Sequence, residues 1–184
     1  SGFLMSVGYD MYLKLLEEAV LTQQGKPLPQ EAACAADLSV AASIPDRYVP
    51  SPEQRMDLYR RIAHIRSEAD ADDMTDELID RYGDPPRSVN NLIAVALLRA
   101  GAAECGMTEI SQKNGCLLFT VPACNFKRVA ELCGDSAYKG RLLFSAGEKP
   151  YLSLRLKKGD DPLRLARKLV DDYASGQAAD VSEV

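Results

Sequence analysis

Apolar positions near the start of the chain recur with the period of an α-helix and then with the period of a strand. The first stretch predicts an amphipathic helix over residues 8–24. Residues 30–37 follow neither period and are expected to form a loop. The alternation of apolar and polar positions from Leu38 to Ile44 predicts a strand with one buried face.

A second helix is predicted to begin after Ser51, which is suited to the N-cap position and precedes Pro52. The helical period continues to about Ser67. The positions expected to be buried in this helix are Met56, Tyr59, Ile62 and Ala63.

Two further helices are predicted on either side of a strong stop signal. Before the stop, Met74, Leu78 and Tyr82 share one helical face. Gly83 can adopt the left-handed conformation that ends a helix, and the prolines at 85 and 86 cannot continue it. After the stop, a wide apolar stripe comprises Val89, Leu92, Ile93, Ala96, Leu97 and Ala100.

Beyond Gly106 the apolar period changes from helical to two, which indicates strands. Asn114-Gly115 between residues 107–112 and 116–121 is a strong hairpin signal, and residues 141–144 and 151–156 predict a second hairpin. A short helix over 125–132 and a last helix opening at Pro162 complete the pattern. Helices followed by a small antiparallel sheet of two hairpins with a closing C-terminal helix define an α+β fold.

Composition narrows the class of function. The chain has 184 residues, 46% of them apolar, a net charge of −5 and a pI near 5.0. That balance argues against a nucleic-acid groove, which needs clustered Lys and Arg. No run of about 18 apolar residues is present that would span a membrane. Five cysteines without a C-x-x-C pair suggest a reducing, cytoplasmic setting rather than a disulfide framework.

Candidate catalytic chemistry is sparse, so no catalytic, cofactor-binding or metal-binding residue is predicted. The single histidine, His64, is expected to be a structural residue inside a helix. The Asp160-Asp161 pair precedes Pro162 at a helix start, where a capping role explains it. The sequence has no phosphate-binding G-x-x-x-x-G-K-[ST] loop and no G-x-S-x-G nucleophile motif. The chain is therefore not expected to be an enzyme by itself.

An acidic stretch is the most informative polar feature. Seven acids and no base lie between Glu68 and Asp80, and Asp73, Glu77 and Asp80 share one helical face. Acids near a helix start suit its dipole, with Asp70 as a possible cap and Asp73 at the third helical position. Glu77 and Asp80 instead lie near the helix end, where negative charge is unfavourable. Two interpretations of these acids remain open: a charged face exposed to solvent, and a stripe of carboxylates that binds arginines of a partner.

Three ordered motifs resemble the bacterial transcription-repair coupling factor family, Mfd. They are the run GYDMYLKLLEEAV from Gly8, the run IPDRYVP from Ile44 with Arg55 and Tyr59 downstream, and the run ELIDRYG from Glu77. The motifs fall within residues 1–106 and thin out over the hairpins and the last helix. The motifs match the family segment that follows the ATP-driven translocase motor. The chain therefore resembles the C-terminal domain of that family, and we expect it to be a piece of a longer protein.

The resemblance implies a regulatory function. In the family, this domain is a clamp that packs on the protein's own N-terminal repair-homology module and masks the surface that binds UvrA. The acids of the family's E-L-x-D motif meet arginine there, which implies an interdomain interface at Glu77 and Asp80, with Asp73 on the same face and Arg81 orienting Glu77. The implied partners are the N-terminal module and, through the full-length factor, UvrA and RNA polymerase, with no direct contact to nucleic acid or membrane.

The resemblance also suggests a division of the chain. Residues 1–24 would be the linker and first helix after the upstream motor, residues 25–174 the C-terminal regulatory domain, and residues 175–184 a frayed tail. A nucleic-acid-binding or metal-binding accessory domain remains the alternative.

Overall fold

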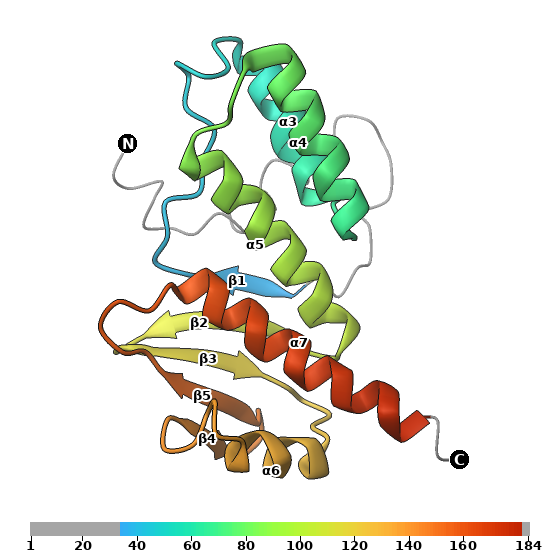
Figure 1. Cartoon of the computed structure of the whole chain (residues 1–184), viewed down its shortest axis with the longest axis vertical. Coiled ribbons are helices and arrows are strands. Elements are labelled where there is room, and N and C mark those ends of the chain that lie inside the picture. Colours follow the sequence, from blue (N-terminus) through green and yellow to red (C-terminus); the bar gives the residue numbers. More distant parts are fainter. Residues whose placement is uncertain (1–33, 182–184) are drawn as a thin grey trace. The chain divides into compact units, whose positions relative to one another are not determined.

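The computed structural model describes residues 34–181, with side chains as far as Gly176, so the helix predicted over 8–24 lies outside the described residues. The chain divides into two compact units (Figure 1). Residues 40–100 form the described part of the first unit. Residues 34–39 and 101–181 form the described part of the second unit. The described part of the first unit therefore lies between two segments of the second in the chain.

The first unit is built from three helices around one apolar cluster. They are α3 (Pro52–Ala63), α4 (Glu68–Tyr82) and the part of α5 (Arg87–Glu104) that extends to Ala100. The stripe predicted along α5 supplies much of the cluster, since Val89 and Leu92 are fully buried. The remaining members come from the connector before α3, the inner faces of α3 and α4, and the loop between these helices: Ile44, Val49, Leu58, Ile62, Ile65, Ala71, Met74 and Leu78.

Local signals in the sequence fix the ends of α3 and α4. The Ser51 side chain accepts a hydrogen bond from the Gln54 N–H at 3.3 Å, as expected of an N-cap. Ser67 caps α4, and Asp70 completes a capping box at the third helical position. Gly83 ends α4 with a φ of 83°, in the left-handed region that favours glycine.

The second unit contains a mixed five-stranded sheet in the order β1-β2-β3-β5-β4. The strands are β1 (Ala35–Asp37), β2 (Glu109–Lys113), β3 (Cys116–Thr120), β4 (Leu142–Ser145) and β5 (Tyr151–Arg155). Both predicted hairpins are confirmed, because β2 pairs with β3 and β4 pairs with β5, each antiparallel. Strand β1 was not predicted, and it pairs parallel to β2.

Two helices pack on this sheet, α6 (Phe126–Gly134) and α7 (Pro162–Val181). Helix α7 crosses one face of the sheet, and α6 contacts both α7 and β4 (Figure 1). The strand positions on that face are buried, including Ile110, Phe119 and Leu152, which are neighbours across β2, β3 and β5. The α+β fold class is confirmed.

Four predictions were wrong in detail. Residues 38–44 do not form a strand. The strand β1 lies just before them, within the segment predicted to be a loop, so the strand was predicted too far along the chain. Helix α3 ends at Ala63 rather than Ser67, which makes His64 its C-cap rather than an interior residue. Met56 is 42% exposed, whereas Leu58 takes the buried position. Ser67 rather than Asp70 caps α4, so Asp70 rather than Asp73 is at its third helical position.

Candidate functional site

The acidic face lies on α4, which two tyrosines attach to the rest of the first unit. The Tyr48 hydroxyl donates to the carbonyl oxygen of Gly83 at 2.7 Å and lies 3.3 Å from that of Leu78. The Tyr82 hydroxyl reaches Gln54 Oε1 of α3 at 2.8 Å, and the rings of Tyr48 and Tyr82 lie 5.7 Å apart. The Tyr48 hydroxyl thus satisfies carbonyls at the C-terminal end of α4, where intrahelical donors run out.

The connector before α3 is held by side chains from the second motif. Arg55 Nη1 donates to the carbonyl oxygens of Val49 at 2.8 Å and Pro50 at 3.1 Å. The Ile44 N–H donates to the Tyr59 hydroxyl at 2.7 Å. The motif from Ile44 to Tyr59 therefore has a structural role, since it fixes the segment that carries Tyr48 against α4.

Glu77 is half-buried between two arginines. Arg61 Nη1 of α3 lies 2.7 Å from Glu77 Oε2, and Arg81 Nη1 lies 4.0 Å from the same oxygen. Glu77 Oε2 is shielded from solvent and, within the described residues, accepts no well-directed hydrogen bond, so its main partner is the close charge of Arg61. The Arg61 guanidinium lowers the pKa of Glu77, and burial opposes that shift. Glu77 is therefore ionised at neutral pH.

Both internal arginines approach the inner oxygen of this carboxylate. The Glu77 side chain keeps 35% of its surface exposed, which leaves Oε1 as the oxygen available to a partner. Asp57, one turn before Arg61, lies 4.0 Å from Arg61 and 3.2 Å from Arg60. The result is a chain of alternating charges that joins α3 to α4 and holds Glu77 in one orientation.

Asp73 and Asp80 lie on the same face of α4 as Glu77, and both are exposed. Neither carboxylate forms an ion pair in the part of the chain that the structure describes. The predicted site thus holds one fixed carboxylate and two open ones. The predicted contact of Arg81 with Glu77 is present but long, and Arg61 is the closer partner. The sequence signal for Arg61 was the pair of basic residues that precedes Ile62 in the second motif.

Replacing Tyr48 by phenylalanine should lower the free energy of unfolding by about 0.5–1.5 kcal/mol, because the carbonyl of Gly83 loses its donor. The measurement is urea unfolding followed by circular dichroism. The matched control is Tyr151→Phe, since Tyr151 is 37% exposed and no partner of its hydroxyl is present among the described residues. An equal effect of both substitutions would contradict the role given to Tyr48.

Other candidate chemistry is accounted for by local structure. Asp161 accepts a hydrogen bond from the Leu163 N–H at 3.1 Å, as a cap does, and Asp160 pairs with Arg141 at 2.5 Å. Burial raises the pKa of the Cys105 thiol to about 11, which keeps it protonated. Among residues 34–176, His, Cys, Asp and Glu form no group of three that could hold a metal ion. No helix in the described range has the length and apolar character needed to cross a membrane.

A model of the TRCF domain family matches residues 38–132, which is half of the chain and includes the whole acidic face. The chain belongs to the TRCF domain family. The match covers α3, α4, α5, the first hairpin and most of α6. It ends before the second hairpin and α7, where the sequence motifs also thin out.

Curated relatives of this TRCF domain are transcription-repair-coupling factors. That of Myxococcus xanthus is 38% identical over 99 residues, which cover 54% of this chain and 8% of the relative. That of Staphylococcus epidermidis is 33% identical over 116 residues, which cover 61% of this chain and 10% of the relative. That of Bacillus subtilis is 30% identical over 121 residues, which cover 65% of this chain and 10% of the relative. The chain therefore spans about a tenth of the length of these relatives.

The fold is similar to a solved structure described as the C-terminal domain of transcription-repair coupling factor. The TM-score is 0.67 at 16% sequence identity, and the match covers 79% of this chain and 95% of that chain. At this identity the likeness concerns the fold. Together with the family match, it confirms the resemblance to the C-terminal domain of this family.

Proposed function

We propose that this TRCF domain is a regulatory interaction domain of a transcription-repair coupling factor. It acts as a clamp whose acidic face packs on an N-terminal repair-homology module of the same protein. In the packed state it masks the surface that binds UvrA. Release of the clamp exposes that surface during transcription-coupled repair, so the domain links the factor to UvrA without catalysing a reaction itself.

The observation that carries this proposal is the arrangement of the three carboxylates on α4. Glu77 is fixed by Arg61 through its inner oxygen, whereas Asp73 and Asp80 are exposed beside it. A solvated charged face does not require a fixed, half-buried carboxylate at the helix end that disfavours negative charge. A docking site does, because preorganised groups lose less entropy on binding.

The geometry favours one mode of arginine binding. Since Glu77 Oε2 already faces Arg61, an incoming guanidinium has access to Oε1 only. Asp80 lies one turn further along the same face, so a guanidinium fork bridges Glu77 and Asp80 rather than gripping one carboxylate with both of its N–H groups. Charge-assisted hydrogen bonds of this kind are stronger than neutral ones.

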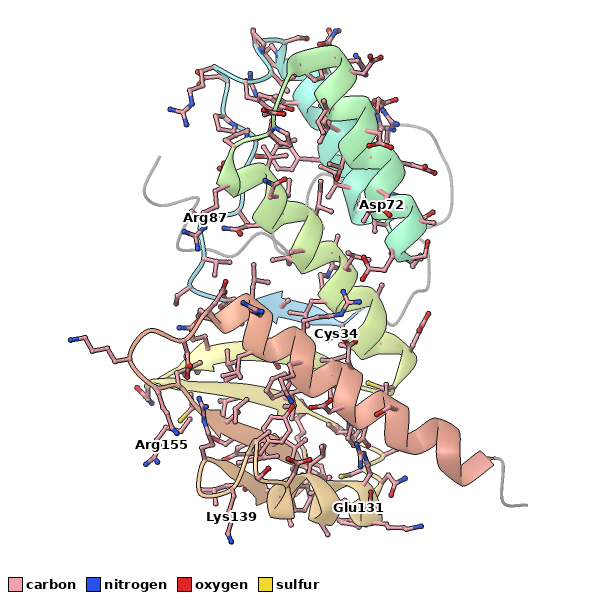
Figure 2. All side chains as sticks on the ribbon, viewed as in Figure 1. Cys34, Asp72, Arg87, Glu131, Lys139 and Arg155 are labelled. Atoms are coloured by element: carbon pink, nitrogen blue, oxygen red, sulfur yellow. The ribbon has the colours of Figure 1, made fainter. Side chains whose placement is uncertain are left out.

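The test is a titration of this chain against the separately expressed N-terminal module, followed by calorimetry. Asp80→Asn keeps the shape of the side chain and removes its charge, so we expect the dissociation constant to rise about tenfold or more, the loss typical of a charge-assisted hydrogen bond. The matched control is Asp72→Asn. Asp72, which is labelled on α4 in Figure 2, is also exposed, but the helical repeat places it about 100° around the helix from Asp73, outside the acidic face.

Equal affinity of Asp80→Asn and the parent chain would contradict the acidic face as the docking site. Loss of binding by both variants would point to general charge attraction instead. A parent chain that does not bind the module at all would overturn the clamp.

A further inference from the structure

Five cations from three separate segments gather at one end of the sheet in the second unit. Lys113 at the end of β2 is the register partner of Cys116, which in turn is the partner of Arg155 at the end of β5. Neighbouring strands lie about 4.8 Å apart, so the backbones of Lys113 and Arg155 are about 10 Å apart across β3. The basic corner is defined here as Lys113, Lys139, Arg155, Lys157 and Lys158.

Hydrogen bonds bring the other cations to the same place. Arg155 Nη2 lies 3.4 Å from the carbonyl oxygen of Gly140, the residue after Lys139. The Leu156 N–H donates to the carbonyl oxygen of Gly115 at 2.8 Å, which sets Lys157 and Lys158 beside the turn that follows Lys113. Figure 2 shows Lys139 and Arg155 projecting from the same end of this unit.

The cations of the basic corner have no direct ion-pair partner among the described residues, although the Asp160 carboxylate interacts electrostatically with Lys157. All five cations are exposed. Two acids follow the corner in the chain, and each has a further partner. Asp160 pairs with Arg141 at 2.5 Å and accepts the Lys157 N–H at 2.7 Å, while Asp161 caps α7.

Three glycine turns leave the corner open to a large ligand. A glycine with a positive φ follows three of the cations along the chain. These glycines are Gly115, two residues after Lys113, with a φ of 74°; Gly140, directly after Lys139, with 79°; and Gly159, directly after Lys158, with 89°. A Cβ placed at any of them would meet no atom within 4 Å. Open space therefore lies beside each of these glycines, where a bulky polyanion can approach the backbone closely.

The side chains of the basic corner favour a nucleic acid over an acidic protein as its ligand. Protein interfaces have an apolar or aromatic centre that carries much of the binding energy. The large apolar side chains exposed in the described part of this unit are Phe126, Leu143 and Tyr151. None belongs to the basic corner, and Tyr151 lies at the opposite end of β5 from Arg155. Binding of a phosphate backbone requires cations alone.

We propose that the basic corner binds the phosphate backbone of duplex DNA without reading its sequence. The net charge of −5 argued against this from composition, but the average conceals a separation of charge. The acids gather on α4 in the first unit, whereas these cations gather in the second. Contacts of this type are weak, with dissociation constants of about 10⁻⁴–10⁻⁶ M at physiological salt.

The experiment measures fluorescence anisotropy of a labelled duplex of about 20 bp and arbitrary sequence with the full 184-residue chain, over a series of salt concentrations. With three to five phosphates contacted, the logarithm of the association constant should fall with the logarithm of the salt concentration with a slope of about −2.7 to −4.5. The triple variant Lys113→Gln/Lys139→Gln/Lys158→Gln should reduce that slope by about 3 and weaken binding at low salt at least tenfold.

The charge-matched control is Arg47→Gln/Arg87→Gln/Lys149→Gln, which removes three exposed cations outside the corner and should leave both values unchanged. Equal weakening by the control overturns the site, as does a parent chain that does not bind the duplex at low salt. Binding of poly-L-glutamate with the same affinity and slope overturns the preference for phosphate. These outcomes do not depend on the clamp, because no residue of the acidic face is changed.

Discussion

Replacing Leu92 by alanine should lower the free energy of unfolding of the first unit by about 2–5 kcal/mol. Leu92 is fully buried in the cluster between α3, α4 and α5, so truncation removes its apolar contacts and leaves a cavity. The surrounding side chains come from three helices and the connector, and they cannot all close on the space at once. The measurement is urea unfolding of the parent and the variant.

Leu97→Ala is the matched control, because Leu97 lies on the same helix but is only partly buried against the same cluster. Its effect should be clearly smaller than that of Leu92→Ala. A loss below about 0.5 kcal/mol for Leu92→Ala would show that α5 is peripheral to the first unit.

Glu77→Ala should have the largest effect on clamp binding, at about 2–5 kcal/mol, which is a loss of affinity on the order of 30- to several-thousand-fold. The substitution removes the acceptor of the docked arginine and leaves that charge unpaired in the interface. In a full-length coupling factor that carries this domain, the variant should therefore bind UvrA more tightly than the parent does, without an activating signal. UvrA binding is measured by pull-down and calorimetry.

The effect of Glu77→Ala on folding should be small. The ion pair with Arg61 is partly exposed on both sides, and such pairs contribute at most about 1 kcal/mol. Arg60→Gln is the control, since Arg60 neighbours Arg61 but pairs with Asp57 rather than with Glu77. Unchanged UvrA affinity in a folded Glu77→Ala protein would contradict the clamp.

Local chemistry made most of the fold predictable. Asn114-Gly115 specified the first hairpin, and both residues adopt the positive φ values that a tight hairpin turn needs. Gly83 and the two following prolines marked the end of α4 in the same way. Strand β1 was missed because its pairing is with β2, far along the chain, and no local pattern in three residues announces such a contact.

The candidate site was only partly predictable for a related reason. Helical spacing placed Asp73, Glu77 and Asp80 on one face, since that depends on one helix alone. The closest partner of Glu77, Arg61, comes from α3, and the contact depends on how two helices pack. Met56 shows the same limit, because the α3 pattern allowed two apolar faces and tertiary packing chose the one with Leu58.

The pairing of β1 with β2 also has a consequence for the order of folding. Ala35 and Glu109 are register partners, and residues 40–100, the described part of the first unit, lie between them in the chain. Closing so long a loop costs conformational entropy before any strand contact forms. Folding of residues 40–100 replaces much of that flexible loop with a rigid body, so β1 should join the sheet late, after these residues and both hairpins have folded. Its amide hydrogens should then be the first in the sheet to exchange with solvent, because a three-residue edge strand is also the first to open.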